Sequence, residues 1–451
     1  MELCEFADLQ SKGRTPTVFW FNPLAEGRIA RGRSFTPVKH QAALVRDLEN
    51  LPQFLCNRDD IVLVGRRPAA RFLSRLKQTG FEPAEFVELA PAPAPPASAL
   101  SHRPLGGLRP WAWGPDSAEL FEPLFAQTAA SQPPLARCYN AGIAGLYSKA
   151  WSAGFLRAFL AGRAPEPWLC PPDEAGVAAR TMDAALAAIA AIRRRRHAKV
   201  AAKEAIGLAG HNAIRLWEPD LLDAQRRWLA GVIEEGGEVV IEPWLEREMD
   251  FSAQLEMETD GLKLRGYTGL INDRKGRYLG NWAAADFDRR LPAAVTRLFH
   301  EPADILDRLH ATYSEIFPAL EAELRQAGFL GPVGIDAFVY RPPHGPCRLK
   351  PIVEINPRFT MGRLTIELMR RICPGGHGLF RLVTLKQARA EGFEDFKACA
   401  RSLAERFPPR LEAGPGGRLR EGAVCLTDPA RAEACLATFR VSRNLDELRA
   451  G

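Results

Sequence analysis

The stretch Pro351-Ile-Val-Glu-Ile-Asn-Pro-Arg-Phe-Thr-Met-Gly-Arg363 decides how the rest of this chain is interpreted. Residues 350–355 have the apolar, β-branched character of a buried strand, and Pro357 is expected to end it because proline cannot donate to a strand ladder. Glu354 and Asn356 are two positions apart, so on a strand both side chains leave from the same face. The stretch therefore predicts a strand that presents a carboxylate and an amide together.

A second strand is predicted just upstream, over residues 332–340, with a proline- and glycine-containing turn between the two. The shortest closure of that turn forms a hairpin in which Tyr340 lies opposite Arg348. In that register Asp336 lies opposite Ile352. Side chains directly across an antiparallel pair share a face, so the hairpin brings a second carboxylate to the first.

Asp336, Glu354 and Asn356 are therefore expected to converge on one face of the hairpin. Two carboxylates and an amide oxygen form a hard, all-oxygen cation site, which Mg²⁺ prefers when phosphates complete its shell. Arg358 follows closely, and its planar fork of donors suits a carboxylate or an anionic intermediate. The alternative is a surface hairpin with ordinary solvated acids, and features elsewhere in the chain argue against it.

Gly331–Tyr340 followed by Val353-Glu-Ile-Asn-Pro-Arg358 resembles the metal-binding core of the ATP-grasp enzymes, particularly the carboxylate–amine ligases. The resemblance implies ATP and Mg²⁺ or Mn²⁺, two ions in all, and phosphorylation of a carboxylate before an amine attacks the acyl phosphate. D-alanine–D-alanine ligases carry arginine two residues before the metal-binding aspartate, where this chain has Gly334. The arginine at position 358 instead resembles the biotin-carboxylase-like and L-amino-acid-ligase-like members.

Two lysines resemble the phosphate-binding lysines of these enzymes. Lys149 shortly precedes a predicted helix, and Lys203 ends a predicted strand that leads into a glycine-punctuated turn. Such a turn is a flexible phosphate cover, although it lacks the Gly-Lys-Ser/Thr of a Walker A loop. The resemblance implies that Lys203 contacts phosphates while the turn, from Gly207 through Gly210 to His211, covers the rest.

The resemblance also implies a hinge between two lobes, whose backbone would present one donor and one acceptor to the adenine edge. The residues that fit this hinge are Glu242, Pro243, Trp244 and Leu245. An acid shortly downstream would hold the ribose hydroxyls. Asp250 fits that role, and Glu248 is its rival because the spacing is one residue looser than in D-alanine–D-alanine ligases.

Several cations are candidates for the acyl side of the reaction or for a further phosphate contact. Arg358 is expected to bind the substrate carboxylate and to act in catalysis, with Arg363 as a second substrate contact. Arg265, Arg274 and Lys275 lie on or after the strand predicted over residues 262–271, and the sequence does not choose among them. Arg274 is expected to be a second catalytic residue.

Composition places the chain among ordinary soluble enzymes. Its 451 residues carry 60 Lys and Arg against 54 Asp and Glu, and the small excess is spread along the chain, which argues against nucleic acid and suits anionic small molecules. Nine scattered cysteines favour reduced thiols. Without a leader pattern or an apolar run near ~18 residues, we expect a cytoplasmic protein away from membranes. The expected partners are carboxylate and amine substrates, and we allow for a homodimer.

The expected fold class is α/β with α+β parts. Residues 1–134 predict a Rossmann-like unit from their β-α-β-α-β order, without the glycine pattern of a dinucleotide site. The resemblance implies a two-lobed ATP-grasp domain over 135–375, with a nucleotide-clamping lobe at about 173–245 and a metal-binding lobe at about 246–375. Residues 376–451 predict a small α+β subdomain.

Three further elements are predicted from local pattern. The alanine-rich segment 173–197 predicts one long helix, and residues 219–235 predict a second. Near the C-terminus, a strand over 422–426 is followed by a final helix that begins at Asp428.

Two other functions remain open. One is an ATP-dependent carboxylase, or a ligase that uses a thiol or hydroxyl nucleophile. The other is a nucleotide-binding regulatory protein on the same scaffold, which the presence of all three metal-site residues argues against. The identity of the substrates does not follow from the sequence, because substrate pockets are formed by loops without a readable code.

Overall fold

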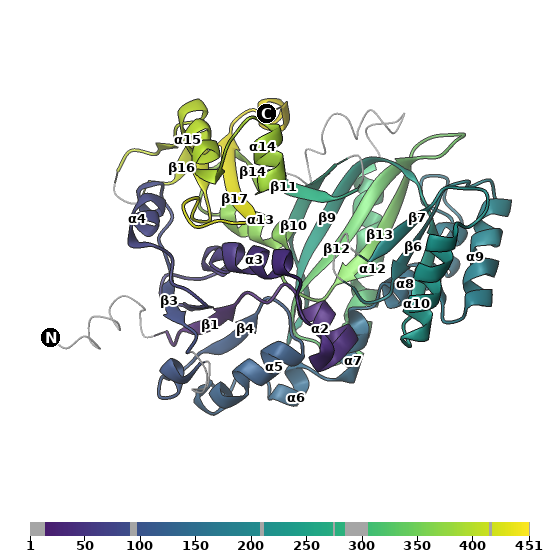
Figure 1. The fold of residues 1–451 in the computed structure, drawn as a ribbon, viewed down its shortest axis with the longest axis horizontal. Helices are drawn as coiled ribbons and strands as arrows, with labels where there is room; N and C mark the ends of the chain where they lie inside the picture. The colour runs from purple at the N-terminus through teal and green to yellow at the C-terminus, as the bar shows by residue number, and fades with distance from the viewer. Residues whose placement is uncertain are drawn as a thin grey trace.

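The computed structural model describes residues 14–90, 97–207, 212–273, 276–284, 305–414 and 417–450. Its strands form three sheets: a four-stranded sheet near the N-terminus, a second four-stranded sheet, and a nine-stranded sheet. Figure 1 shows the N-terminal sheet at the lower left and the second small sheet at the right, with the large sheet running from the centre to the upper left. The predicted combination of a parallel α/β unit with α+β lobes is confirmed.

The N-terminal sheet is parallel throughout, with the strand order β3-β2-β1-β4. Strand β2 is completely buried, as its continuous apolar sequence predicts for a strand covered on both faces. The elements of this unit are β1 (Thr17–Trp20), α2 (Ala25–Arg31), α3 (Lys39–Leu48), β2 (Ile61–Val64), α4 (Ala70–Gln78), β3 (Glu85–Glu88), β4 (Gly107–Pro110) and α5 (Pro115–Phe121). The short helices α6 (Leu135–Cys138) and α7 (Ala141–Leu146) then lead into α8 (Lys149–Ala161).

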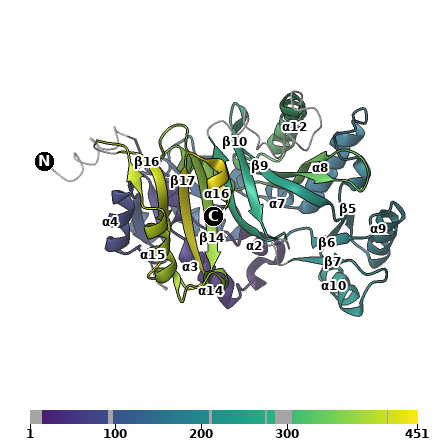
Figure 2. The same ribbon diagram turned by 90° about the horizontal axis from the view of Figure 1, so that it is seen from above.

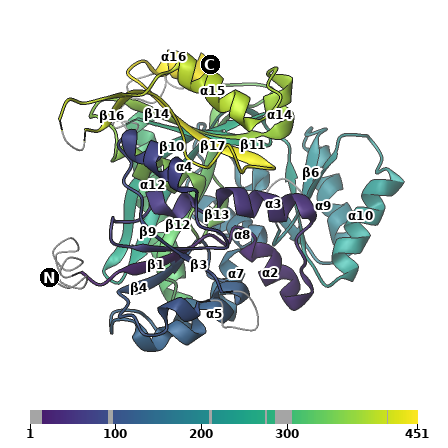
Figure 3. The ribbon, with the colours of Figure 1, turned by 60° about the vertical axis from the view of Figure 1, so that its left-hand side comes forward.

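The second small sheet is antiparallel, in the order β5-β8-β6-β7, and packs against two helices. Its elements are β5 (Val177–Ala179), α9 (Met182–Arg194), β6 (Val200–Glu204), β7 (Ala213–Leu216), α10 (Asp223–Glu234) and β8 (Val239–Pro243). Figure 2 shows it at the end of the molecule opposite to α4, and Figure 3 shows α2 between it and the N-terminal sheet.

The helix predicted over residues 173–197 is shorter than expected. Thr181 caps α9 by accepting a hydrogen bond from the backbone N–H of Ala184 at 3.2 Å, so the helix begins at Met182. The residues before the cap form β5, which pairs with β8. Pairing with a distant strand overrides the helix propensity of the alanine-rich sequence there.

The nine-stranded sheet is antiparallel at every pair, in the order β13-β12-β9-β10-β11-β14-β17-β16-β15. Its strands are β9 (Glu246–Glu258), β10 (Gly261–Asn272), β11 (Tyr278–Ala284), β12 (Gly331–Arg341), β13 (Arg348–Asn356), β14 (His377–Thr384), β15 (Arg410–Leu411), β16 (Leu419–Cys425) and β17 (Cys435–Ser442). The helices along this part are α12 (Ile305–Gln326), α13 (Met361–Met369), α14 (Leu385–Ala390), α15 (Phe396–Arg406) and α16 (Leu445–Ala450).

The C-terminal segment extends this sheet, because β14 pairs with β11. The final helix predicted from Asp428 is wrong: residues 435–442 form β17, and the only helix after it is the short α16. Strand β17 lies between β14 and β16 and is almost wholly buried. From Ala437 to Ser442 its sequence alternates apolar and polar residues, which is a strand signal that the helix prediction overlooked.

The side chains of β9 alternate between an apolar face and a polar face of the sheet. Its odd-numbered residues pack in the same core as helix α12, and they are Phe251, Ala253, Leu255 and Met257. Its even-numbered residues Ser252, Gln254 and Glu256 are buried on the opposite face. Buried polar groups need hydrogen-bond partners, so this face of the sheet is a candidate for a functional site.

The N-terminal sheet packs against α13 and the C-terminal strands. Phe19 and Leu48 share one hydrophobic core with Leu364 of α13 and with Phe380 and Phe439 of the large sheet. This shared core fixes the N-terminal unit over the polar face of the sheet.

No helix within the described ranges is long and apolar enough to cross a bilayer. The eight cysteines that the structure describes are free thiols, which confirms for those residues the prediction from their scattered spacing.

The close contact between β11 and β14 gives a test of the sheet. A Cβ on Gly280 would lie 2.2 Å from the carbonyl oxygen of Phe380, a backbone atom that cannot move aside. We therefore expect Gly280→Ala to lower the free energy of unfolding by about 1–3 kcal/mol, measured by chemical denaturation.

Gly231 in α10 is the matched control, because a Cβ there meets nothing within 4 Å. Gly231→Ala should leave stability unchanged or raise it by up to about 1 kcal/mol through helix propensity. A Gly280→Ala protein as stable as wild type would contradict the pairing of β11 with β14.

Candidate functional site

The predicted hairpin is formed by β12 and β13, which pair antiparallel with Tyr340 opposite Arg348 as expected. Asp336 lies opposite Glu354, so the prediction that it faces Ile352 is wrong. A bulge after Asp336 places two more residues on β13 than on β12. Because the shift is of two residues, every side chain keeps its face, and the two carboxylates lie directly across from each other.

Pro351 explains the bulge. It follows Lys350, which still lies opposite Phe338, and it has no N–H to donate to the ladder. Its carbonyl oxygen accepts a hydrogen bond from the hydroxyl of Tyr313 at 2.9 Å. Proline within a predicted strand is therefore the sequence signal for this change of register.

Asp336, Glu354 and Asn356 meet on the polar face, where the Asn356 side-chain amide donates to Asp336 at 3.3 Å. Burial, together with the neighbouring Glu354, raises the pKa of Asp336 to about 6. A divalent cation would relieve the repulsion between these carboxylates. Among the described residues, no group of three or more His, Cys, Asp or Glu side chains is arranged to hold a metal. An ion here would need further oxygens from a ligand, as a phosphate-bound Mg²⁺ does.

Lys149 lies beside this carboxylate pair. It begins helix α8, which Ser148 caps, and its Nζ is 3.0 Å from Oε1 of Glu354. The same Nζ donates to the carbonyl oxygen of Gly207 at 3.1 Å. Burial acts to raise the pKa of Glu354, but Lys149 and Arg358 outweigh it and lower that pKa. Lys149 therefore joins the hairpin of β12 and β13 to the start of the glycine turn.

Glu242 of β8 is buried between two lysines. Lys203 forms a salt bridge with one carboxylate oxygen, and Nζ of Lys350 lies 3.2 Å from the other. Lys350 also donates to the carbonyl oxygen of Glu174 at 3.1 Å. Burial acts to raise the pKa of Glu242, but the two lysines outweigh it and lower that pKa strongly. The sequence did not identify Lys350 as a site residue, although a lysine within an apolar strand is a signal that could have done so.

One small pocket lies between α8, the second small sheet and β13. Its charged lining consists of Lys149, Lys203, Glu242, Lys350 and Glu354. Three cations against two carboxylates leave the pocket positive, which suits a phosphate group.

The predicted hinge lies beside a cleft of about 430 Å³. Trp244 and Leu245 line this cleft together with both candidate ribose acids, Glu248 and Asp250. The backbone N–H of Trp244 donates to the carbonyl oxygen of Lys199 at 2.9 Å, which ties the hinge to β6. The structure therefore places Trp244 and Leu245 on the same cleft as the two acids, and their roles as hinge and ribose acid stay predictions.

The other two hinge residues belong to β8, and the two acids each have an arginine partner. Glu242 points into the lysine pocket, and Pro243 pairs with Val200 of β6. Arg247 binds Asp250 at 2.8 Å. Glu248 lies 2.7 Å from a guanidinium nitrogen of Arg341.

Arg358 lies at the meeting point of the N-terminal unit and the hairpin. Its Nε donates to Oε1 of Glu26 at 2.7 Å, and its Nη1 donates to the carbonyl oxygen of Phe359 at 3.2 Å. Glu26 is only 6% exposed and comes from α2, so the N-terminal unit supplies a charged group to the site. Sequence reasoning missed Glu26, because nothing local distinguishes it from an ordinary helical acid.

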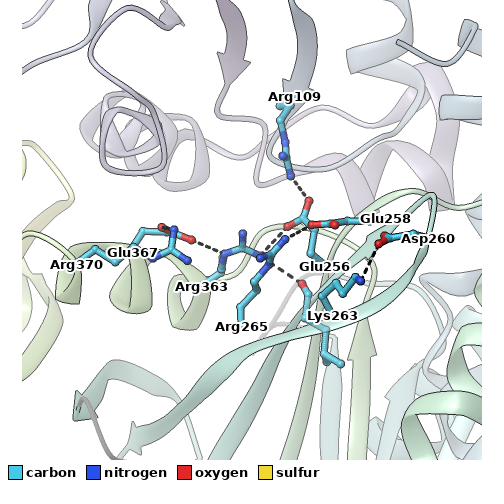
Figure 4. Close-up of polar contacts among 10 residues, drawn as sticks. Arg109, Glu256, Glu258, Asp260, Lys263, Arg265, Arg363, Glu367 and Arg370 are labelled. Carbon is cyan, nitrogen blue, oxygen red and sulfur yellow. Dashed lines mark hydrogen bonds and ion pairs between the residues drawn. The ribbon is translucent and has the colours of Figure 1, made fainter. Parts of the chain in front are cut away.

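Arg363 lies in a buried charge network on the same face of the sheet (Figure 4). Its Nη1 is 2.7 Å from Oε2 of Glu256, and its Nε is 2.8 Å from Oε1 of Glu367. Arg109 reaches from the N-terminal unit to the other oxygen of Glu256. The structure thus places Arg363 with Arg109, and its substrate contact stays a prediction.

One of the remaining candidate site residues, Arg265, lies within the described part of the chain. Arg265 on β10 binds Glu258 at the far end of β9. The candidates outside the described residues are Gly210, His211, Arg274 and Lys275.

Gly334 has no room for the arginine of D-alanine–D-alanine ligases. It lies opposite Asn356, and a Cβ would come within 2.8 Å of Cγ2 of Thr360. The hydroxyl of Thr360 donates to Gln254 at 2.6 Å, which holds that methyl group in place. The site therefore has no arginine at this position, and the anion-binding role of Arg358 stays a prediction.

The buried Lys350 gives a test of this arrangement. Lys350→Met should lower the free energy of unfolding by about 3 kcal/mol, because it leaves the buried Glu242 with one lysine instead of two. The double variant Lys350→Met/Glu242→Gln should lose less than the sum of the two single variants, measured by chemical denaturation.

Lys397 on α15 is exposed, so Lys397→Met is the matched control and should change stability by no more than about 0.5 kcal/mol. Additive losses in the double variant, within about 0.5 kcal/mol, would show that the two side chains do not interact.

Comparison with known proteins finds similarity in structure alone. Neither known protein families nor curated proteins give a match. An N5-carboxyaminoimidazole ribonucleotide synthetase in complex with ADP is 11% identical, with a TM-score of 0.50, over 97% of this chain and 96% of its own. A biotin carboxylase from Campylobacter jejuni, in a β,γ-ATP complex, is 12% identical, with a TM-score of 0.50, over 97% of this chain and 90% of its own. At this identity the comparisons establish the fold, and the chain has the ATP-grasp fold that its motifs resemble.

Proposed function

We propose that this protein is an ATP-dependent ligase. It would join a small carboxylic acid, an amino acid or a peptide-like acid, to an amine through an acyl phosphate, and release ADP and phosphate. The observation that carries the proposal is the buried pair Asp336 and Glu354, which lie opposite each other between a lysine pocket and Arg358. Phosphoryl transfer between two anions needs this combination of metal ligands and fixed cations.

The nucleotide would extend from the hinge cleft to the carboxylate pair. Trp244 and Leu245 would meet the adenine edge, and Asp250, or Glu248 in its place, would hold the ribose. The two similar structures named above contain ADP and a β,γ-ATP ligand, which supports nucleotide binding by a protein of this fold.

The phosphates would lie in the lysine pocket. Lys149 and Lys203 now neutralise Glu354 and Glu242, so each would share its charge with a phosphate when nucleotide binds. Gly207, at the start of the glycine turn, is already held by Lys149. The turn, including Gly210 and His211, would cover the phosphates and exclude water, which protects an acyl phosphate from hydrolysis.

Asp336, Glu354 and Asn356 would hold Mg²⁺ or Mn²⁺, as two ions, which supply charge neutralisation between the phosphates and the carboxylate. Glu26 fixes the Nε of Arg358, so that the guanidinium has one orientation beside the pair. We propose that Arg358 binds the substrate carboxylate and stabilises the oxyanion that forms when the amine attacks. Arg274 as a catalytic residue and Arg363 as a substrate contact are part of the same proposal.

The domain division follows this function. Residues 1–134 would form the pre-ATP-grasp unit that supplies Glu26, and residues 135–375 the two-lobed catalytic part. Residues 376–451 contribute strands β14 to β17 to the same sheet as the metal-site hairpin, so we propose that they support the site.

An ATP-dependent carboxylase is the second candidate. It is favoured by the Glu-x-Asn-x-Arg sequence at residues 354–358 and by the names of the two similar structures. In that reaction the carboxylate phosphorylated by ATP is bicarbonate, so the same residues would serve it.

The test is Mg²⁺-dependent release of ADP from ATP, with amino acids and small acids supplied with and without amines, and with bicarbonate in a separate series. We expect ADP release that requires both an acid and an amine. Glu354→Gln removes a charge with little change of volume, and should lower that turnover by about 10²-fold or more, since a preorganised electrostatic contact is lost.

Glu405 on α15 is exposed, so Glu405→Gln is the matched control and should keep full turnover. Turnover with bicarbonate and no other acid would favour the carboxylase. Near-normal magnesium-dependent turnover by Glu354→Gln would remove the metal-site assignment.

A further inference from the structure

A second cleft, of about 380 Å³, lies between the N-terminal unit and the polar face of the large sheet. Residues 108–113 and helix α6 form one side, and the end of β9 with residues 357–359 forms the other. We call it the arginine cleft, after the lining residues Arg109, Arg137 and Arg358. Its volume is that of a site for a small organic molecule.

Strand β9 places this cleft relative to the carboxylate pair. Along its polar face, Asp250 lines the hinge cleft, Ser252 lies opposite Asp336, and Glu256 lines the arginine cleft. At ~3.3 Å per residue, Glu256 lies ~13 Å beyond Ser252, in the direction away from Asp250. The arginine cleft and the hinge cleft therefore lie on opposite sides of the carboxylate pair, and Arg358 reaches the pair from the arginine cleft.

The wall of the cleft is aromatic and fixed by packing. Trp111 and Phe359 are in contact, with ring centroids 5.9 Å apart, and both are 3% exposed. Trp113 packs edge-on against Phe121 at 6.0 Å, and its carbonyl oxygen accepts a hydrogen bond from Tyr147 at 2.9 Å. Trp111 and Phe359 are therefore part of the core behind the cleft, and the half-buried Trp113 is the ring that can meet a flat apolar group.

The two acids that line the cleft, Glu256 and Glu258, are paired with arginines. Glu256 is bound by Arg109 on one oxygen and by Arg363 on the other, and Glu258 is bound by Arg265, as Figure 4 shows. Burial acts to raise the pKa of Glu256, but the two arginines outweigh it and lower that pKa, so the carboxylate stays ionised and paired. Neither acid leaves an unbalanced negative charge for a ligand.

Two arginines of the cleft are not paired with its acids, although Glu26 binds the Nε of Arg358. Arg358 lies at the inner end beside the carboxylate pair, and its side chain is 19% exposed. Arg137 is exposed at the rim on α6, and within the described part of the chain its side chain has no hydrogen-bond or ion-pair partner. The cleft thus has a cation at each end, with the half-buried Trp113 ring in its lining.

We infer that the arginine cleft binds the acid substrate, and that this substrate has a flat apolar body and a second anionic group. The reacting carboxylate lies at Arg358, the body packs on Trp113, and the second anionic group meets Arg137. The inference rests on the proposed function for the identity of the reacting carboxylate, while the binding of such an acid is a separate property of the cleft.

The experiment is isothermal titration of the full-length protein with three probes: phenylsuccinate, succinate and 3-phenylpropanoate. Phenylsuccinate has both the ring and two carboxylates, and each of the others lacks one feature. We expect phenylsuccinate to bind most tightly. Arg137→Gln should weaken phenylsuccinate about tenfold, the scale of one charge-assisted hydrogen bond, and should leave 3-phenylpropanoate unchanged. Arg137→Glu should weaken it further, since it reverses the charge.

Arg401 on α15 is exposed and lies outside the cleft lining, so Arg401→Gln is the matched control and should change none of the three affinities. The inference is overturned if phenylsuccinate binds no more tightly than succinate, or if both Arg137 variants bind it as wild type does. Tight binding without ADP release in the presence of any amine would contradict the ligase and leave the cleft assignment intact. Acid-dependent ADP release that neither Arg137 variant affects would contradict the cleft assignment and leave the ligase proposal intact.

Discussion

Two buried carboxylates that face each other across one hairpin are the constraint on which the rest of this structure depends. Such a pair is unfavourable unless cations compensate it, because burial and mutual repulsion both oppose ionisation. Lys149 comes from α8 and Arg358 from the segment after β13, and both lower the pKa of Glu354. Glu26 then holds Arg358 from the N-terminal unit. Three separate parts of the chain are thus brought together around Asp336 and Glu354.

The two clefts and the carboxylate pair lie in a row along the polar face of β9. Period-two alternation puts Asp250, Ser252, Gln254, Glu256 and Glu258 on one face. Ser252 lies opposite Asp336 in the neighbouring strand, while Asp250 and Glu258 line the two clefts on either side. We therefore regard the strand as the axis of the proposed reaction, with nucleotide, metal and acid in that order. The N-terminal sheet and α13 share one hydrophobic core, which holds the N-terminal unit over this face.

Local pattern predicted the hairpin and its functional face, because the face of a strand residue depends only on its parity. It did not predict the register at Asp336, which Pro351 shifts by two residues. Lys350 and Glu26 were missed because their partners lie far away in the sequence. The place of Lys350 within an apolar strand was a signal, whereas nothing local marks Glu26. Residues 435–442 were misassigned although Ala437–Ser442 alternates apolar and polar residues, so there the prediction overlooked a local strand signal. Sequence thus predicts what is local, and tertiary packing sets the rest.

The most direct test of the central claim is electron paramagnetic resonance of Mn²⁺ titrated into the full-length protein with and without ADP. The hairpin supplies only the oxygens of Asp336, Glu354 and Asn356, so we predict that tight Mn²⁺ binding requires ADP to complete the shell. Asp336→Asn should abolish this ADP-dependent binding. Asp220 is exposed, so Asp220→Asn is the matched control and should leave the binding unchanged. Mn²⁺ binding that is equally tight without ADP, or unchanged in Asp336→Asn, would contradict the account.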